Sequence, residues 1–238
     1  MDRWEVGTEM IGETTEASLN ESLELFREFH GKGGGRLRYA FCPRGSRNCT
    51  EPLWHDLAAI ATEKETLLHS HALENEAQTR RLEREGGTDV VYLNRLGATG
   101  PHLVLAHCVW ASPAEIDLLA QTDTRVAHCP SANMKLASGF APVPEFLEHG
   151  VKVGLGADGA PCNNNLDMFT EMRLAGTDSQ TALRTAQYER APGSRNGDHW
   201  RRTGTQPRPR DWISRSGQAR GCDCVETRGL ARATRVRR

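Results

Sequence analysis

Four segments of the chain end an apolar run in a side chain that can bind a metal ion or move a proton. They occupy residues 67–74, 105–108, 126–130 and 154–159, and they carry His71, His107, His128 and Asp158. A strand that is buried on both faces and then ends in polar chemistry is typical of a parallel barrel whose active site lies at the carboxyl ends of its strands. The segments therefore predict one site assembled from successive strand ends.

The sequence between these segments predicts the elements that position them. The sequence predicts helices at residues 15–30, 52–64, 113–122, 143–148 and the start of 166–175, and a charged helix at 74–85. Short apolar runs predict strands at 37–42, 66–71, 103–108, 125–129 and 151–157. Alternating strands and helices favour an α/β fold with a parallel sheet. The five strand–helix units are fewer than the eight that a closed barrel needs.

The charge of the chain is divided unevenly. The 238 residues carry a net charge of −1, but residues 176–238 hold 14 arginines, no lysine and 6 acidic residues, whereas the rest holds 16 basic and 25 acidic residues. The apolar spacing also ends near Ala175. We therefore expect a folded acidic domain over residues 1–175 and an irregular tail over residues 176–238.

The cysteines indicate the cellular compartment. There are 7, and Cys108 and Cys129 each follow a histidine inside an apolar run. This pattern suits reduced, buried thiols and predicts a cytoplasmic protein. Cys222 and Cys224 form a C-x-C pair that is too short to indicate a zinc site alone. No run is long enough to cross a membrane and no signal peptide is recognisable, so no membrane partner is expected.

Three longer motifs are specific enough to indicate a family. Residues 105–110 (LAHCVW), 127–139 (AHCPSANMKLASG) and 156–169 (GADGAPCNNNLDMF) resemble the amidohydrolase superfamily. The most similar branch is that of S-adenosylhomocysteine/5-methylthioadenosine deaminases, with triazine hydrolases and guanine deaminase as relatives. The resemblance covers about residues 1–175. It implies a metal-dependent (β/α)8 TIM barrel, of which this chain would hold roughly strands 4–8.

The resemblance also implies a reaction, which is the hydrolytic deamination of an amino-purine nucleoside or related N-heterocycle. A divalent metal supports such a reaction because it lowers the pKa of bound water to about 7. Zinc is the implied cofactor, and nitrogen and carboxylate ligands also accept iron. The implied partner is a small heterocyclic substrate and not nucleic acid, and the intact parent is compatible with a homo-oligomer.

Roles for four side chains follow from the resemblance. His71 corresponds to the metal ligand of the fifth strand, and Glu74 to the catalytic glutamate that carries protons to the ring nitrogen. His107 corresponds to a histidine that touches the attacking water or the substrate. Asp158 corresponds to a metal ligand that also takes the proton from water.

The histidines also have structural alternatives. His69 and His71 would suit a first-strand His-x-His pair, but Glu74 three residues on and the strand upstream argue against it. A single histidine such as His107 is an alternative core residue with satisfied hydrogen bonds. We interpret His128 as structural and exclude it from the catalytic set.

Substrate contact is the least specific part of the prediction. Cys162 occupies a position that faces the substrate in relatives. Arg44 occupies a position where some relatives carry a substrate-contacting histidine. Asp158 has the alternative of a turn residue in a glycine-rich loop. Residues 163–165, three asparagines, either cap a helix or contact the substrate, and the sequence does not decide between these roles.

The arginine-rich tail has two interpretations. One is a basic disordered segment that binds nucleic acid. The other is a shifted reading frame, because the codons of Trp200-Arg201 and Trp212-Ile213, read one base later, each force a glycine. Those glycines have the spacing of two family glycines that are otherwise missing. We favour the frameshift and expect no function in residues 176–238.

The family comparison leads to an expectation for the whole chain. The family's first His-x-His segment and about three strands have no counterpart. We therefore expect a fragment that binds catalytic metal weakly and is inactive by itself. Two other functions stay open: a triazine or chloro-heterocycle hydrolase, and a non-enzymatic binding protein with a basic tail.

Overall fold

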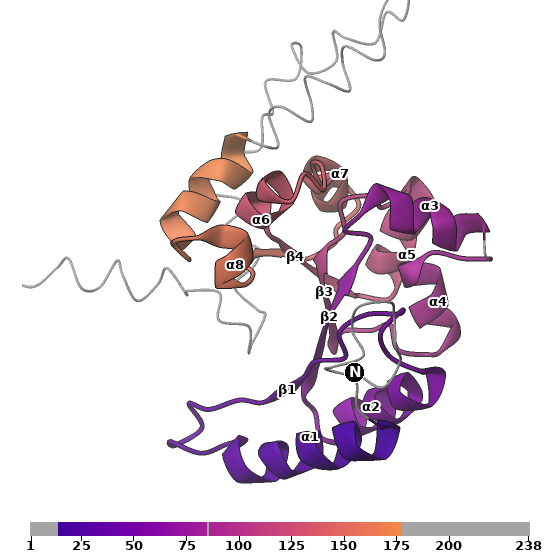
Figure 1. Cartoon of the computed structure of the whole chain (residues 1–238), viewed down its shortest axis with the longest axis vertical. Helices are drawn as coiled ribbons and strands as arrows, with labels where there is room; N and C mark the ends of the chain where they lie inside the picture. Colours follow the sequence, from indigo (N-terminus) through magenta and orange to yellow (C-terminus); the bar gives the residue numbers. More distant parts are fainter. Residues whose placement is uncertain (1–13, 85, 178–238) are drawn as a thin grey trace, which may run out of the picture.

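One parallel sheet organises residues 14–84 and 86–177, which are the residues that the computed structural model describes (Figure 1). Its strands are β1 (Ala40–Phe41), β2 (Leu67–Ala72), β3 (Leu103–His107), β4 (Arg125–His128) and β5 (Val153–Leu155). They lie side by side in chain order. The predicted α/β class is confirmed, and the arrangement is that of a partial barrel.

The register brings the carboxyl ends of the strands to one edge of the sheet. His71 of β2 lies opposite Ala106 of β3, which lies opposite Ala127 of β4. Ala127 in turn lies opposite Gly154 of β5. The polar residues that follow these positions are therefore neighbours at the same end, as their order in the sequence predicts.

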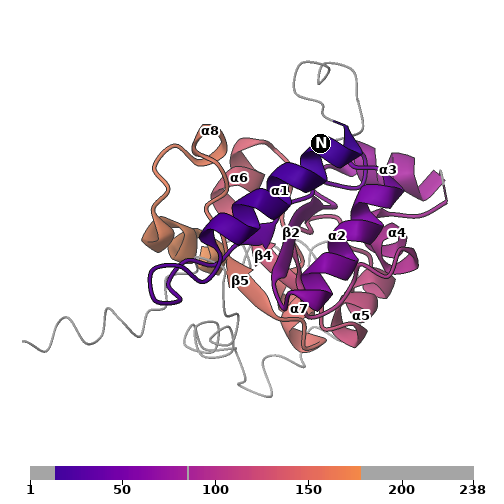
Figure 2. The ribbon, with the colours of Figure 1, turned by 90° about the horizontal axis from the view of Figure 1, so that it is seen from below.

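Helices connect the strands, and most of them cover one face of the sheet, as Figure 1 and Figure 2 show. They are α1 (Thr15–Phe29), α2 (Glu51–Glu63), α3 (Glu76–Arg84), α4 (Asp89–Arg95), α5 (Pro113–Gln121), α6 (Pro130–Lys135), α7 (Val143–Glu148) and α8 (Ala160–Asn163). Residues 168–177 are also helical. Helix α1 packs on α2, α2 packs on β2, and α5 packs against both α4 and α7.

The predicted long helices agree with the structure, and three short ones were missed. Helices α4, α6 and α8 have 7, 6 and 4 residues. The edge strands are shorter than predicted, with 2 residues in β1 and 3 in β5.

Local capping fixes where the longer helices begin. The Thr14 hydroxyl accepts a hydrogen bond from the amide of Ala17 at the start of α1. Thr50 does the same for Leu53 in α2, which also has a proline in its first turn. The predicted Ser112 N-cap of α5 is part of a capping box with Glu115.

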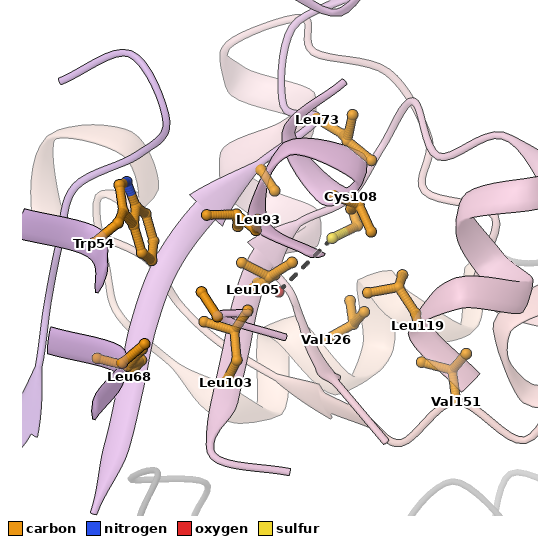
Figure 3. Close-up of a cluster of buried hydrophobic side chains, with 14 of the residues drawn as sticks. Trp54, Leu68, Leu73, Leu93, Leu103, Leu105, Cys108, Leu119, Val126 and Val151 are labelled. Atoms are coloured by element: carbon orange, nitrogen blue, oxygen red, sulfur yellow. Dashed lines mark hydrogen bonds between the residues drawn. The ribbon is translucent and has the colours of Figure 1, made fainter. Parts of the chain in front are cut away.

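The core lies between the sheet and its helices (Figure 3). Trp54 from α2 and Leu119 from α5 are fully buried against Leu68, Leu103 and Leu105 of the central strands. Burying one such leucine stabilises the fold by about 1.5–3 kcal/mol.

Several sequence predictions fall at the margin of the described residues. The tail at 176–238 lies outside them from residue 178 onward, so the domain boundary and both interpretations of the tail stay predictions. In the described part, no helix is both long and apolar enough to cross a membrane. Its five cysteines, Cys42, Cys49, Cys108, Cys129 and Cys162, are all free thiols.

Candidate active site

His71 is oriented by the backbone of the loop that follows β1. The carbonyl oxygen of Arg44 lies 2.7 Å from the His71 Nδ1, so this nitrogen donates to it and carries the proton. The Nε2 lone pair is then left for a metal or a proton, which is the usual arrangement of a ligating histidine. The Arg44 side chain itself is exposed. Its demonstrated contact with the site is therefore through its backbone.

His107 is the most buried of the predicted site residues, with 1% of its side chain exposed. Its Nδ1 lies 2.9 Å from the Oδ1 of buried Asn133 in α6. Its ring stacks on that of His71, with 5.5 Å between centroids. His107 and Cys108 both have positive φ angles, which turns the chain sharply at the end of β3. The structure thus brings His71 and His107 together, as predicted.

Glu74 completes a group of three at the ends of β2 and β3. Its Oε2 lies 3.9 Å from the Nε2 of His107, and its side chain is 32% exposed. The separation is longer than a hydrogen bond, so both groups can face one reacting atom. Because Nδ1 of His107 is engaged by Asn133, the nitrogen nearest Glu74 is the one free to exchange a proton.

His69 shares a strand with His71 but not its environment. Burial lowers the pKa of His69, and the neighbouring His71 and His107 lower it further. The imidazole is therefore neutral near pH 7. Strand β1 precedes and pairs with β2, so the pair does not lie on the first strand of this sheet.

Asp158 follows β5 in a loop that is held by a buried carboxylate. Its φ is +59°, and its Oδ1 accepts a hydrogen bond from the amide of Gly159. The Nδ2 of Asn163 donates hydrogen bonds to the carbonyl of Ala157 and to Oε1 of Glu171, and each bond is 2.7 Å long. Glu171 is fully buried. Asn163 therefore has a structural role in this loop.

Acidic side chains at the strand ends raise the pKa values of two nearby thiols, Cys162 and Cys129. Burial raises the pKa of the Cys162 thiol, and the negative charges of Asp158 and Glu74 raise it further. Burial, followed by Asp158 and Glu171, raises the pKa of Cys129 to about 12. Cys162 and Cys129 thus share the acidic surroundings of Asp158 and are protonated near pH 7. The structure brings Cys162 close to Asp158, and its contact with substrate stays a prediction.

The described side chains supply part of a metal site. His71 and Asp158 are of the types that zinc prefers. Within residues 14–84 and 86–177, however, no group of three or more His, Cys, Asp or Glu side chains is close enough to hold a metal ion. A complete zinc site is therefore not formed by the described residues alone.

Two site residues were missed by sequence reasoning. Asn133 holds His107 from a position 26 residues away, and nothing in the local pattern indicates that pairing. Glu171 had a detectable signal. It lies three residues after Met168 and four before buried Ala175, on the inner face of its helix, where a carboxylate needs partners. His128 is fully buried in β4, and its exclusion from the catalytic set stays a prediction.

These features have the context of a known family. The chain belongs to the Amidohydrolase family, whose sequence profile matches residues 2–190. It is 45% identical over 168 residues to a 5'-deoxyadenosine deaminase of Methanothermobacter thermautotrophicus, which covers 69% of this chain and 39% of that protein. It is 42% identical over 164 residues to a 5-methylthioadenosine/S-adenosylhomocysteine deaminase of Haloarcula marismortui, covering 68% and 38%. The chain thus spans about two fifths of these relatives.

Solved structures agree with this placement. An adenosine deaminase from Xanthomonas campestris with bound zinc superposes with a TM-score of 0.68 at 26% identity, covering 73% of this chain and 39% of that one. The zinc complex of atrazine chlorohydrolase TrzN from Arthrobacter aurescens gives 0.69 at 25%, covering 73% and 39%. Guanine deaminase from C. acetobutylicum superposes with a TM-score of 0.71 at 23% identity, covering 82% of this chain and 46% of that one. It supports the fold alone.

Proposed function

We propose that the protein takes part in the hydrolytic deamination of an amino-purine nucleoside or a related N-heterocycle. The observation that carries this proposal is the pair of Glu74 and His107, 3.9 Å apart at the ends of adjacent strands and next to the anchored His71. The deaminase relatives support the same reaction class.

In the proposed mechanism, the carboxylates of Asp158 and Glu74 each transfer a proton. Water adds to the ring carbon that bears the amino group, and Asp158 takes the proton that the water loses. Glu74, in its protonated form, delivers a proton to the adjacent ring nitrogen, while His107, whose Nδ1 donates to Asn133, faces the tetrahedral centre with Nε2. Asp158 then gives its proton to the amino group and the carbon–nitrogen bond breaks with loss of ammonia. The carbon-bound hydroxyl becomes a carbonyl and its proton goes to Glu74, so both carboxylates regain their starting states. Cys162 and Arg44 are proposed to face the substrate.

We propose zinc as the metal of the intact enzyme, in line with the zinc-bound relatives, with iron as the alternative. His71 and Asp158 would be two of its ligands, and a zinc ion would acidify the attacking water. The remaining ligands would come from outside the described residues. The proposed partner is a small heterocycle in the cytoplasm, without nucleic acid or membrane, in a protein that is compatible with a homo-oligomer.

A triazine or chloro-heterocycle hydrolase is the second candidate. The similarity to the atrazine chlorohydrolase favours it, because proton delivery to a ring nitrogen by Glu74 would assist the loss of chloride as well as of ammonia. The product distinguishes the two reactions. Ammonia release from 5'-deoxyadenosine or 5-methylthioadenosine supports deamination, and chloride release from atrazine supports the alternative. A basic-tailed binding protein would depend on residues outside the described part.

The test uses Glu74→Gln with a matched control. Because this chain spans 39% of the Methanothermobacter relative, the assay includes a hybrid in which residues 14–177 replace the matched segment of that enzyme. We expect Glu74→Gln to lower kcat for ammonia release about 10²–10⁴-fold. Glu76→Gln should leave it unchanged, since Glu76 is exposed and pairs with Arg80. A folded, zinc-loaded hybrid that releases no ammonia would contradict the proposal.

A further inference from the structure

Asp89, the first residue of α4, is a buried carboxylate that the proposed mechanism does not use. Only 2% of the residue is exposed. Its Oδ2 accepts a hydrogen bond of 2.9 Å from the amide of Leu73, and its Oδ1 accepts one from the hydroxyl of Ser46. Burial raises the pKa of Asp89, and these two hydrogen bonds act in the opposite direction.

These hydrogen bonds connect two loops at the catalytic end of the sheet. Ser46 lies in the loop after β1, two residues beyond Arg44, whose carbonyl orients His71. Leu73 lies directly after β2 and directly before Glu74. A single side chain thus joins the loop that orients the candidate metal ligand to the loop that carries the candidate catalytic carboxylate.

The backbone of Leu73 is fixed on both sides. Its amide is held by Asp89, and its carbonyl accepts a hydrogen bond of 3.0 Å from the amide of Trp110. Its φ is +52°, a backbone conformation that residues other than glycine rarely adopt. Leu73 is 1% exposed and lies in the core. Such a conformation persists only where its surroundings impose it. The direction in which the chain enters Glu74 therefore depends on these contacts.

A second buried carboxylate offers a comparison. Glu115 is 2% exposed and accepts hydrogen bonds from the amide and hydroxyl of Ser112, and from the hydroxyl of Thr88. It joins the start of α5 to the residue before Asp89. No hydrogen bond connects it to Leu73 or Glu74 among the described residues. Glu115 is thus similar in burial and chemistry to Asp89 but has no direct contact with the Glu74 loop.

We propose that Asp89 is a positioning residue that sets the geometry of Glu74 relative to His107, acting through the amide of Leu73. The inference rests on the proposed function for the meaning of that geometry. The contact itself exists without any substrate, so it can be tested separately.

The experiment compares variants of the 238-residue chain. Asp89→Ala removes both hydrogen bonds. Asp89→Asn can keep them, because its Oδ1 can accept from Leu73 while its Nδ2 donates to the Ser46 hydroxyl. Ser46→Ala removes only the link to the β1 loop, and Glu115→Gln changes the other buried carboxylate.

Two measurements report the result. The first is hydrogen exchange of the Leu73 amide, with the Val126 amide as reference, since Val126 donates an equally long bond of 2.9 Å to Lys152 in the distant part of the sheet. The second is the ¹³C chemical shift of the Glu74 carboxyl carbon, which reports its surroundings near His107.

For Asp89→Ala we expect Leu73 exchange to rise about tenfold while Val126 exchange is unchanged, together with a shifted Glu74 signal. Asp89→Asn, Ser46→Ala and Glu115→Gln should each keep Leu73 and Glu74 close to the unaltered chain. Equal increases at Leu73 and Val126, an unmoved Glu74 signal, or failure of Asp89→Asn to restore both readings would overturn the proposal. A folded, zinc-loaded hybrid enzyme that releases no ammonia would count against the proposed function and would leave this result intact.

Discussion

The two ends of the candidate site are held in different ways. At β2 and β3, His71 and His107 come directly from central strands whose outer faces are fully buried. At β5, Asp158 follows a strand of 3 residues and is partly exposed. Its loop is held by side chains instead, through Asn163 and the buried Glu171. Backbone pairing thus places one half of the site and a buried polar network places the other.

The difference means that the two halves should respond to different mutations. Central strands tolerate the loss of a polar partner but not of core volume, because packing holds them. The β5 loop should behave in the opposite manner. Four expected outcomes follow from this contrast, beginning with the largest change in stability.

Shortening a buried side chain of the central strand β3 should cause the largest loss of stability. Leu105 of β3 is fully buried, so Leu105→Ala is expected to cost about 2–5 kcal/mol of unfolding free energy through lost burial and the cavity left behind. Leu155→Ala in partly exposed β5 should cost about 1 kcal/mol. Urea unfolding followed by circular dichroism measures both. Equal losses would show that the two strands are held alike.

Removing the carboxylate behind the β5 loop should come second. Glu171→Ala leaves the Asn163 side chain and the Ser131 amide without their acceptor, at a cost of about 1–3 kcal/mol. Limited proteolysis should show earlier cleavage near Asp158 than near His71. The control is Asp117→Ala, which breaks an exposed pair with His149 and should cost about 0–1 kcal/mol. Uniform cleavage of both regions would argue against a local role for Glu171.

The zinc affinity of the chain should depend on both halves of the site, through His71 and Asp158. Because the described residues contain no complete metal cluster, we expect a dissociation constant weaker than about 1 μM for the 238-residue chain, measured by competition with a coloured chelator. His71→Ala and Asp158→Ala should each weaken it by about tenfold or more. His149→Ala, which lies on the outer helix layer, should not. Tight binding that survives both changes would place the metal elsewhere.

Thiol labelling leaves the fold unchanged and should resolve the contrast most finely. Cys108, Cys129 and Cys162 follow β3, β4 and β5. Burial raises the pKa of Cys108 well above its ordinary value and that of Cys129 to about 12, whereas Cys162 is partly exposed. At pH 8, iodoacetamide should therefore modify Cys162 at least about tenfold faster, as seen by peptide mass spectrometry. In urea all three should react, and equal rates in the native chain would contradict the prediction.

The central half of the site was the more predictable from sequence. An apolar run followed by His71 or His107 is a local signal, and in-register parallel strands must bring such residues together. The motifs around them indicated the family, and the family match and its deaminase relatives agree with that interpretation.

The supporting residues were not predictable for a physical reason. Asn133 and Glu171 act through side-chain hydrogen bonds to residues far away in sequence, and local periodicity carries no information on such pairs. The short helices α4 and α6 escaped notice, whereas α7, which has 6 residues, was predicted, so length alone does not explain the omission. Asp89 illustrates the same limit, since a charged residue at the start of a helix is usually explained by the helix dipole alone.

The brevity of the outer strands has a consequence for how the molecule meets copies of itself. An open sheet presents unpaired amide and carbonyl groups on its outermost strands, which can template the addition of further strands and lead to aggregation. Here β1 offers 2 residues and β5 offers 3 in the described part of the chain. Among the described residues, neither outer strand is long enough to guide a stable ladder between molecules, so this part of the sheet limits the addition of further strands.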